Sequence, residues 1–216
     1  MLFKIHSGYS WKRHVLVILP LLLIVCIIGI TQGFHGEGPR QFFHALRESR
    51  PSMTWAMQTV SDYGNVALYA VYAGLAAHAW VTHDQCESRF IVRAVIGAIL
   101  FAFLLMRFLK EGFGMPRPDY AWPPHPFGFV HGYTSFPSGH TATVVTAALP
   151  LALWFKEKSI SLALALVIAA MGFSRLWLGV HHPVDIIGGI VVGSLAARFI
   201  FQPRPQPNRF GYFSLE

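Results

Sequence analysis

The sequence is poor in charged residues. Asp, Glu, Lys and Arg make up 12% of its 216 residues, against roughly a quarter in an ordinary soluble domain. Acidic residues are the scarcer kind, with 10 Asp and Glu against 17 Lys and Arg, so the formal net charge is +7 at pH 7. This composition excludes a typical soluble domain and indicates a protein of the lipid bilayer. Because the few cations are spread among long apolar runs, we expect a lipid partner and no nucleic acid.

Cysteine is also rare. The two cysteines are Cys26, inside an apolar run, and Cys86, in a polar segment. They are not spaced as a metal-binding cluster, and segments at different depths in a membrane do not bring two thiols together. We therefore expect no disulfide framework and no cysteine-bound metal, and we assign neither cysteine a role. Separately, no cofactor is expected.

Apolar residues make up 54% of the chain and are gathered in segments that approach the ~20 residues needed to span a bilayer. The six candidate spans are approximately 14–31, 63–82, 90–109, 140–155, 160–177 and 184–201. Short polar links between them predict antiparallel neighbours, so we expect an all-α polytopic membrane protein built as a six-transmembrane-helix bundle. The first run lacks a small-residue cleavage site, so we expect it to remain as an anchor.

The numbers of Lys and Arg residues on the two sides of the predicted spans indicate the orientation in the membrane. More of them fall on the side that carries the N-terminus, and cytoplasmic loops are enriched in these residues. We therefore expect a cytoplasmic N-terminus over 1–13, one membrane domain over 14–202 and a cytoplasmic tail over 203–216. The bilayer is predicted to be a bacterial inner membrane, with the polar loops discussed below in the periplasm.

Two connecting segments have distinct compositions. Residues 36–62 interleave aromatic and charged residues, which predicts a short periplasmic helix in the membrane interface, with a plain surface connector as the alternative. Residues 111–137 are rich in Gly, Pro and aromatics, which predicts an irregular loop. The aromatic residues of this loop are Tyr120, Trp122, Phe127, Phe129, Tyr133 and Phe136. We hypothesise that they border the path of a lipid into the site; simple anchoring at the interface is the alternative.

The polar residues that could bind a ligand or take part in catalysis lie near the ends of the predicted spans. Lys110 and Arg117 lie at the exit of the third span, residues 137–140 precede the fourth, Arg175 ends the fifth, and residues 181–185 open the sixth. Odd spans leave toward the same side from which even spans start. The predicted topology therefore gathers all these groups at one membrane face.

The three cations of this set need a partner. Burying Lys110, Arg117 and Arg175 without compensation is costly at a low-dielectric boundary, so we expect an anion with several oxygens, such as phosphate. Ser138 and Gly139 lie where a helix begins, and the free N–H groups of a helix start bind anions. Gly139 allows close approach of the backbone, while Ser138 either caps the helix or donates its hydroxyl to phosphate.

The two histidines of the set have complementary predicted roles. His181 and Asp185 are four residues apart with Pro183 between them at a favourable first helical position. A carboxylate that holds one ring nitrogen leaves the other free as a nucleophile or base, and His140 is placed to act as general acid. This set predicts two-step phosphoryl transfer through a phosphohistidine without a metal. We assign no catalytic role to His78, Arg107, His125, His131 and His182.

Three sequence blocks carry a family resemblance. They read KEGFGMPRP over 110–118, PSGH over 137–140 and SRLWLGVHHPVD over 174–185. In order and spacing they resemble the type 2 phosphatidic acid phosphatase superfamily, closely over 110–185 and only in general character elsewhere.

The resemblance implies a six-helix core and a catalytic role for each motif residue. Phosphate is expected to be bound by Lys110, Arg117, Ser138, Gly139 and Arg175. His140 would protonate the leaving group, His181 would attack phosphorus and Asp185 would orient His181. Vanadate is expected to inhibit, because it mimics the five-coordinate state.

Three functions stay open at this point. The first is hydrolysis of a lipid phosphomonoester or pyrophosphate, on phosphatidylglycerophosphate, undecaprenyl pyrophosphate, phosphatidate or lipid A. The second is phosphotransfer from one lipid to another by the same residues. The third is a non-enzymatic transporter, which would place polar residues deep in several spans, whereas these spans are apolar between their ends. We expect no obligate protein partner.

Overall fold

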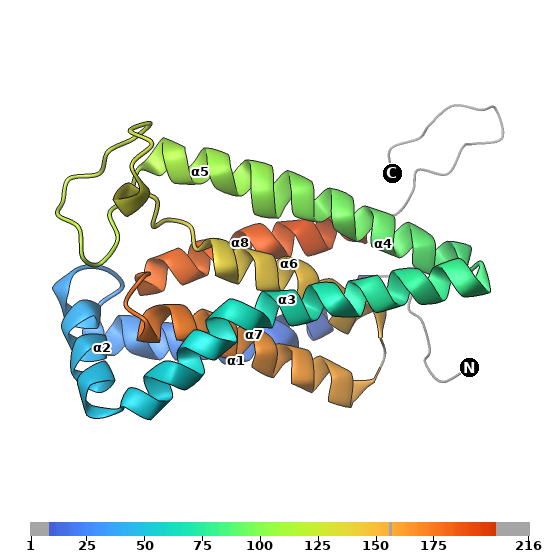
Figure 1. Cartoon of the computed structure of the whole chain (residues 1–216), viewed down its shortest axis with the longest axis horizontal. Coiled ribbons are helices and arrows are strands. Elements are labelled where there is room, and N and C mark those ends of the chain that lie inside the picture. The colour runs from blue at the N-terminus through green and yellow to red at the C-terminus, as the bar shows by residue number, and fades with distance from the viewer. Residues whose placement is uncertain (1–8, 156, 202–216) are drawn as a thin grey trace.

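The computed structural model describes residues 9–155 and 157–201, and the regular secondary structure of these ranges is helical. The elements are α1 (Trp11–Gln32), α2 (Glu37–Ser49), α3 (Pro51–Thr82), α4 (Gln85–Gly97), the π-helix η1 (Ala98–Leu105), α5 (Met106–Phe113), the 3-10 turn η2 (His131–Tyr133), α6 (Gly139–Trp154), α7 (Lys158–Trp177) and α8 (Pro183–Ile200). The long helices run along one axis as a bundle (Figure 1). The all-α prediction is confirmed.

Each predicted span falls on a helix or on a continuous helical rod. The third predicted span lies within a rod over 85–113, made of α4, η1 and α5. Among the described residues, four helical segments are long and apolar enough to cross a membrane: α1, the 85–113 rod, α7 and α8. Helices α3 and α6 do not meet both conditions, and α6 has only 16 residues.

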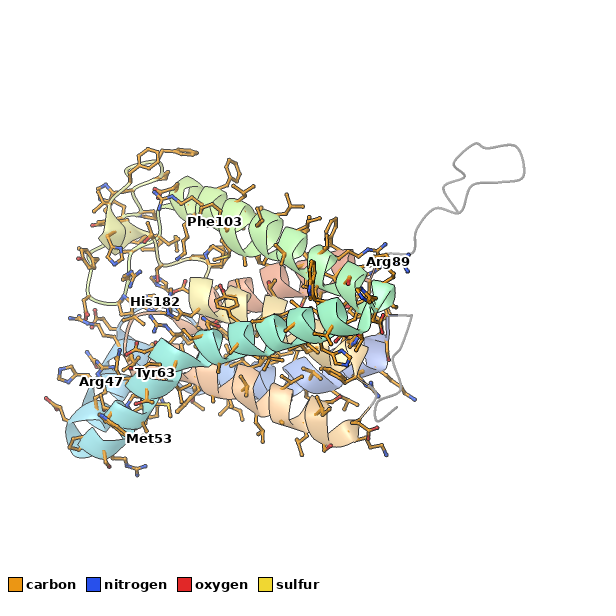
Figure 2. All side chains as sticks on the ribbon, turned by 45° about the vertical axis from the view of Figure 1, so that its right-hand side comes forward. Arg47, Met53, Tyr63, Arg89, Phe103 and His182 are labelled. Atoms are coloured by element: carbon orange, nitrogen blue, oxygen red, sulfur yellow. The ribbon has the colours of Figure 1, made fainter. Side chains whose placement is uncertain are left out.

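Helix α6 forms the centre of the bundle. It packs against α8, α7, α3, η1 and α1, and all its residues from Val144 to Trp154 are buried. Because protein surrounds α6, its length is not set by the thickness of a hydrocarbon layer. The surrounding helices turn large apolar side chains outward, such as Ile27, Val71, Phe103 and Leu166; Figure 2 shows Phe103 projecting from the rod.

Glycines bring α8 close to α6. A Cβ atom added to Gly193 would lie 2.5 Å from Cβ of Val145, and one added to Gly189 would lie 2.7 Å from the carbonyl oxygen of Ser138. Small residues at a helix interface allow the two backbones to approach closely. The first turns of α6 and α8, which contain the predicted site residues Gly139, His140 and Asp185, are thereby held side by side.

The structure corrects the prediction for residues 36–62. Only α2, Glu37–Ser49, is a separate short helix, because Arg50 leaves the helical conformation and Pro51 begins α3. Proline fits the first turn of a helix, where its missing N–H is not needed. Residues 51–62 are therefore the first turns of the long helix α3, and one interfacial helix over 36–62 is wrong.

The predicted irregular loop is confirmed from Gly114 onward, with the short turn η2 inside it, while α5 continues to Phe113. The predicted tail over 203–216 and the first part of the predicted segment 1–13 lie outside the described residues.

The contact between Gly193 and Val145 generates a stability prediction. We expect Gly193→Ala to lower the free energy of unfolding by about 1–3 kcal/mol, because the added methyl overpacks the α6–α8 interface. Gly74→Ala is the matched control, since a Cβ there meets no atom within 4 Å and alanine favours a helix by up to about 1 kcal/mol over glycine. Thermal unfolding in detergent measures both variants. Equal shifts would contradict the close α6–α8 packing.

Candidate active site

The predicted site residues meet at one end of the bundle. They come from the end of α5, the loop that precedes α6, the end of α7 and the short turn into α8, which all lie at the left in Figure 1. The α3–α4 and α6–α7 connections lie at the opposite end (Figure 1). The prediction that these segments share one end of the molecule is confirmed.

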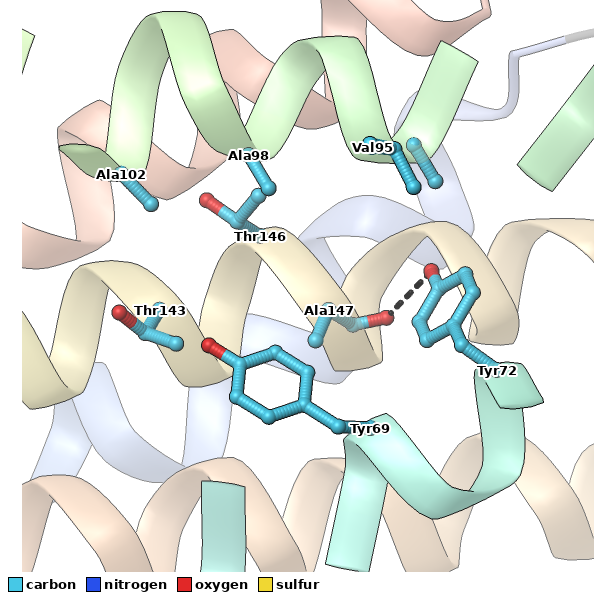
Figure 3. A pocket seen from close by; sticks show the side chains of 9 residues that line it. Tyr69, Tyr72, Val95, Ala98, Ala102, Thr143, Thr146 and Ala147 are labelled. Carbon is cyan, nitrogen blue, oxygen red and sulfur yellow. Dashed lines mark hydrogen bonds between the residues drawn. The ribbon is translucent and has the colours of Figure 1, made fainter. Parts of the chain in front are cut away.

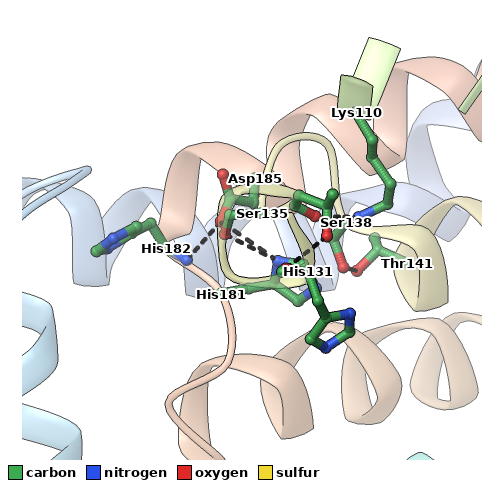
Figure 4. A network of polar contacts seen from close by, with 9 residues as sticks. Lys110, His131, Ser135, Ser138, Thr141, His181, His182 and Asp185 are labelled. Atoms are coloured by element: carbon green, nitrogen blue, oxygen red, sulfur yellow. Dashed lines mark hydrogen bonds and ion pairs between the residues drawn. The ribbon is translucent and has the colours of Figure 1, made fainter. Parts of the chain in front are cut away.

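Asp185 joins the start of α6 to the start of α8. Its carboxylate oxygen Oδ2 accepts hydrogen bonds from the Ser135 hydroxyl at 2.5 Å and from the His182 backbone N–H at 2.8 Å. Its backbone carbonyl accepts from the N–H of Ser138 at 2.9 Å. Pro183 occupies the first turn of α8 as predicted, which places Asp185 where its side chain reaches back over the turn (Figure 4).

His181 lies against this carboxylate. Its Nδ1 is 3.3 Å from Oδ2 of Asp185 and 3.4 Å from the hydroxyl oxygen of Ser135. Burial lowers the pKa of the His181 imidazole to about 4, although the hydrogen bond and the negative charge of Asp185 act in the opposite direction. The ring is therefore neutral near pH 7. With Nδ1–H directed at the carboxylate, the lone pair of Nε2 is free.

Ser135 is a member of the site that sequence reasoning missed. It is fully buried, and Figure 4 shows it with His181 beside the Asp185 carboxylate. The serine lies three residues before Ser138, in a segment predicted only as irregular loop. No spacing rule connects it to Asp185, because their contact depends on how the loop folds onto α8.

The three predicted phosphate-binding cations act on one another. The side chain of Lys110 donates to the Thr134 carbonyl at 2.5 Å, and the charges of Arg117 and Arg175 both act on it. Burial lowers the pKa of the Arg117 guanidinium, against the opposing charge of Asp185. Among the described residues, Nε of Arg117 and Nε of Arg175 are buried without a hydrogen-bond partner. Buried donors of this kind require a partner, and an oxyanion supplies one.

Helix α3 contributes a second group that the sequence did not reveal. Ser61 is 2% exposed and accepts a hydrogen bond from Nη1 of Arg175. The neighbouring Asp62 is exposed, and its charge acts on Arg175 and on His140. These residues belong to the stretch predicted as an interfacial helix. Their position in the site follows from the continuation of α3 through 51–62.

The start of α6 differs in one respect from the prediction. Ser138 is the residue that precedes the helix, but its hydroxyl makes no capping hydrogen bond and instead accepts from the Thr141 hydroxyl at 3.1 Å. A Cβ on Gly139 would lie 3.6 Å from Cε of Lys110, so the lysine stem passes directly beside this glycine. His140 follows in the first turn and is acted on by the charges of Arg175, Lys110 and Arg117.

His182 and Arg107, to which no role was assigned, have structural partners. The His182 ring points away from His181 (Figure 4) and packs against the ring of His35 with centroids 4.1 Å apart. Arg107 forms a 2.9 Å ion pair with Glu111. Within the described ranges, no group of three or more His, Cys, Asp or Glu side chains is assembled as a possible metal site.

Comparison with known proteins identifies relatives of this chain. The family model described as the PAP2 superfamily matches residues 91–209. Lipid phosphate phosphatase 2 of Arabidopsis thaliana is 24% identical over 93% of this chain and 81% of its own length. Undecaprenyl-diphosphatase BcrC of Bacillus subtilis is 28% identical over 74% and 79%, and lipid A 4'-phosphatase of Porphyromonas gingivalis is 32% identical over 54% and 52%. No solved structure matches the chain.

The hydrogen bond from Ser135 to Asp185 yields a kinetic prediction. We expect Ser135→Ala to lower kcat for phosphate release by about 10- to 100-fold, because a hydrogen bond to a charged group contributes roughly 1.5–3 kcal/mol. Ser49→Ala is the control, since that exposed hydroxyl bonds only the Leu46 carbonyl in α2 and its loss should leave kcat unchanged. An unaltered kcat in Ser135→Ala would show that the serine does not support the carboxylate.

Proposed function

The chain belongs to the PAP2 superfamily, and on that basis we propose that it is a membrane lipid phosphatase that hydrolyses a lipid phosphomonoester or pyrophosphate. The observation that carries this proposal is the buried contact between His181 and Asp185 beside three cations, at the end of an apolar helical bundle. The candidate substrates are phosphatidylglycerophosphate, undecaprenyl pyrophosphate, phosphatidate and lipid A.

The proposed reaction has two steps. In the first, Nε2 of His181 attacks phosphorus, the bond from phosphorus to the leaving oxygen breaks, and His140 gives that oxygen a proton. In the second, water attacks the phosphohistidine, His140 takes the proton from the water, and the P–N bond breaks to release phosphate. Asp185 holds Nδ1–H throughout and stabilises the positive charge that develops on the ring.

The remaining motif residues are proposed to bind the phosphoryl group. Lys110, Arg117 and Arg175 would neutralise its equatorial oxygens, with the N–H groups at the start of α6 beside Ser138 and Gly139 as further donors. The buried Nε atoms of the two arginines are consistent with this role, because a bound oxyanion would satisfy them. The proposed reaction requires no metal.

We further propose that the bundle crosses a bacterial inner membrane six times, through α1, α3, the 85–113 rod, α6, α7 and α8. The burial of α6 accounts for its short length, and the outward apolar side chains support contact with lipid. Both termini would be cytoplasmic, with 14–202 as the membrane domain, and the site would face the periplasm. Helix α2, at the same end as the site, would lie in the outer interface (Figure 1).

A cavity next to the site is suited to the hydrocarbon part of a substrate. It has a volume of about 110 Å³ and lies between α3, the 85–113 rod and α6 (Figure 3). Small and apolar groups such as Ala98, Ala102 and Ala147 line it. Thr143, also in the lining, is one helical turn beyond His140. A lipid whose leaving oxygen meets His140 would therefore extend its chain into this cavity.

The central test uses detergent-purified protein, excess chelator and the four candidate lipids. We expect phosphate release from at least one lipid, inhibition by vanadate, and a fall to the uncatalysed background in His181→Ala, because that variant has no nucleophile. The control is His44→Ala, which removes an exposed imidazole on α2. If the labelled phosphate appeared in a second lipid and not as free inorganic phosphate, the protein would be a phosphotransferase. Strict dependence on a divalent metal would contradict the mechanism.

The cavity generates a second prediction. Ala102→Leu should raise KM for a long-chain lipid phosphate by about tenfold, because displacing two methylenes costs roughly 0.8 kcal/mol each, while kcat/KM for a water-soluble aryl phosphate stays unchanged. Ala73→Leu, on an exposed position of α3, is the matched control. An equal loss for both substrates would argue against a hydrocarbon site.

A further inference from the structure

Helix α2 is fastened to the end of α7 by an aromatic contact. Phe43 is 2% exposed and packs edge-on against Phe173 and Trp177 of α7, with ring centroids 6.1 and 6.5 Å apart. Trp177 also contacts α3, because its indole N–H donates to the hydroxyl of Thr54 at 3.0 Å. Helices α2 and α3 thus both contact the last turn of α7.

Arg47 adds a polar bond at the same place. Its Nη1 donates to the backbone carbonyl of Trp177 at 2.6 Å. The final carbonyls of a helix lack partners within the helix, and a cation near them also interacts favourably with the helix dipole. Arg47 is half-buried, whereas Arg50, three residues further along, is exposed. Figure 2 shows Arg47 at the same end of the molecule as His182.

Gly179 makes room for this guanidinium. Its φ is +68°, a left-handed conformation that favours glycine. A Cβ atom at this position would lie 2.6 Å from Nη1, 2.9 Å from Nη2 and 3.0 Å from Cζ of Arg47. The turn and the arginine are therefore complementary: the glycine lets the chain reverse, and the guanidinium occupies the space that a side chain would need.

The turn held by Arg47 lies between two groups of the site. Arg175 precedes Trp177, and the N–H of Val180 returns to the Arg175 carbonyl at 3.3 Å. His181 follows immediately. The backbone from Arg175 to His181 is thus a single reversal that α2 contacts through Arg47, although α2 contributes no motif residue.

We propose that Arg47 is a positioning residue for phosphoryl transfer, which by binding the Trp177 carbonyl fixes the α7–α8 turn and so the placement of His181 relative to Arg175. This role rests on the function proposed above. Arg47 does not touch the phosphate; it acts through the turn. A nucleophile displaced by a fraction of an ångström still binds substrate with the surrounding cations but attacks more slowly.

The experiment compares Arg47→Ala, Arg47→Lys and the control Arg50→Ala. The control removes the same charge from an exposed position directly after α2. Turnover of a water-soluble aryl phosphate is divided by the amount of enzyme that can form an acid-labile, alkali-stable phosphohistidine. This division removes the effect of misfolded protein. We expect Arg47→Ala to lower kcat per competent site by about tenfold or more with KM within about twofold. Arg47→Lys, which keeps a donor, should recover most of the rate, and Arg50→Ala should match the unaltered chain.

A purely structural role would lower the melting temperature and the number of competent sites but leave the rate per site unchanged. That result, or equal rates per site for Arg47→Ala and Arg50→Ala, would overturn the proposal. If the unaltered chain formed no phosphohistidine and released no phosphate, the proposed function would fail and this role would fall with it. The two failures are therefore distinguishable.

Gly179→Ala supplies an independent check within the same experiment. Its methyl would displace the guanidinium, so the single change should slow the per-site rate as Arg47→Ala does. The methyl meets the guanidinium only while Arg47 is present, although the left-handed φ of residue 179 disfavours alanine in both backgrounds. The double variant should therefore lose less rate per site than the product of the two single losses. If the rate losses of the two single variants multiplied in full in the double variant, the proposed coupling between Arg47 and the turn would be overturned.

Discussion

A single carboxylate oxygen determines how the site is assembled. Oδ2 of Asp185 accepts from the Ser135 hydroxyl and the His182 N–H and lies beside His181, so one buried atom connects the loop before α6 with the turn before α8. Burying a negative charge is costly unless several donors surround it, and here those donors come from segments 50 residues apart in the chain. The close α6–α8 contact allowed by Gly189 and Gly193 holds those segments at the required separation. The carboxylate, the glycine interface and the neutral His181 are parts of one arrangement.

The sequence predicted the parts of this arrangement that local rules govern. Apolar runs predicted the helices, Pro183 predicted where α8 starts, and a four-residue spacing predicted the pairing of His181 with Asp185. Motif positions at alternate span ends predicted their meeting at one end of the bundle. Each of these inferences depends on helix geometry or on alternation along the chain, which a single sequence contains.

The parts that escaped prediction depend on tertiary folding. Ser135 looked like any loop residue until the loop folded onto α8, and Ser61 was assigned to an interfacial helix because charged and aromatic neighbours obscured the continuation of α3. The sequence indicates no role for Arg47, since nothing in its surroundings points to a carbonyl 130 residues away. Two roles were open for the Ser138 hydroxyl, and of these the capping hydrogen bond is not formed, because the hydroxyl accepts from Thr141.

The burial of α6 has a consequence for how the protein responds to its surroundings. When the hydrocarbon layer becomes thicker or thinner, a helix that faces lipid must tilt or the bilayer around it must deform, and such mismatch carries an energetic cost. Helix α6 is enclosed by its neighbours over most of its length, so variation in bilayer thickness acts on the outer helices and reaches His140 only indirectly. The candidate site at the start of α6 is thereby insulated from changes in the thickness of the bilayer that surrounds the chain.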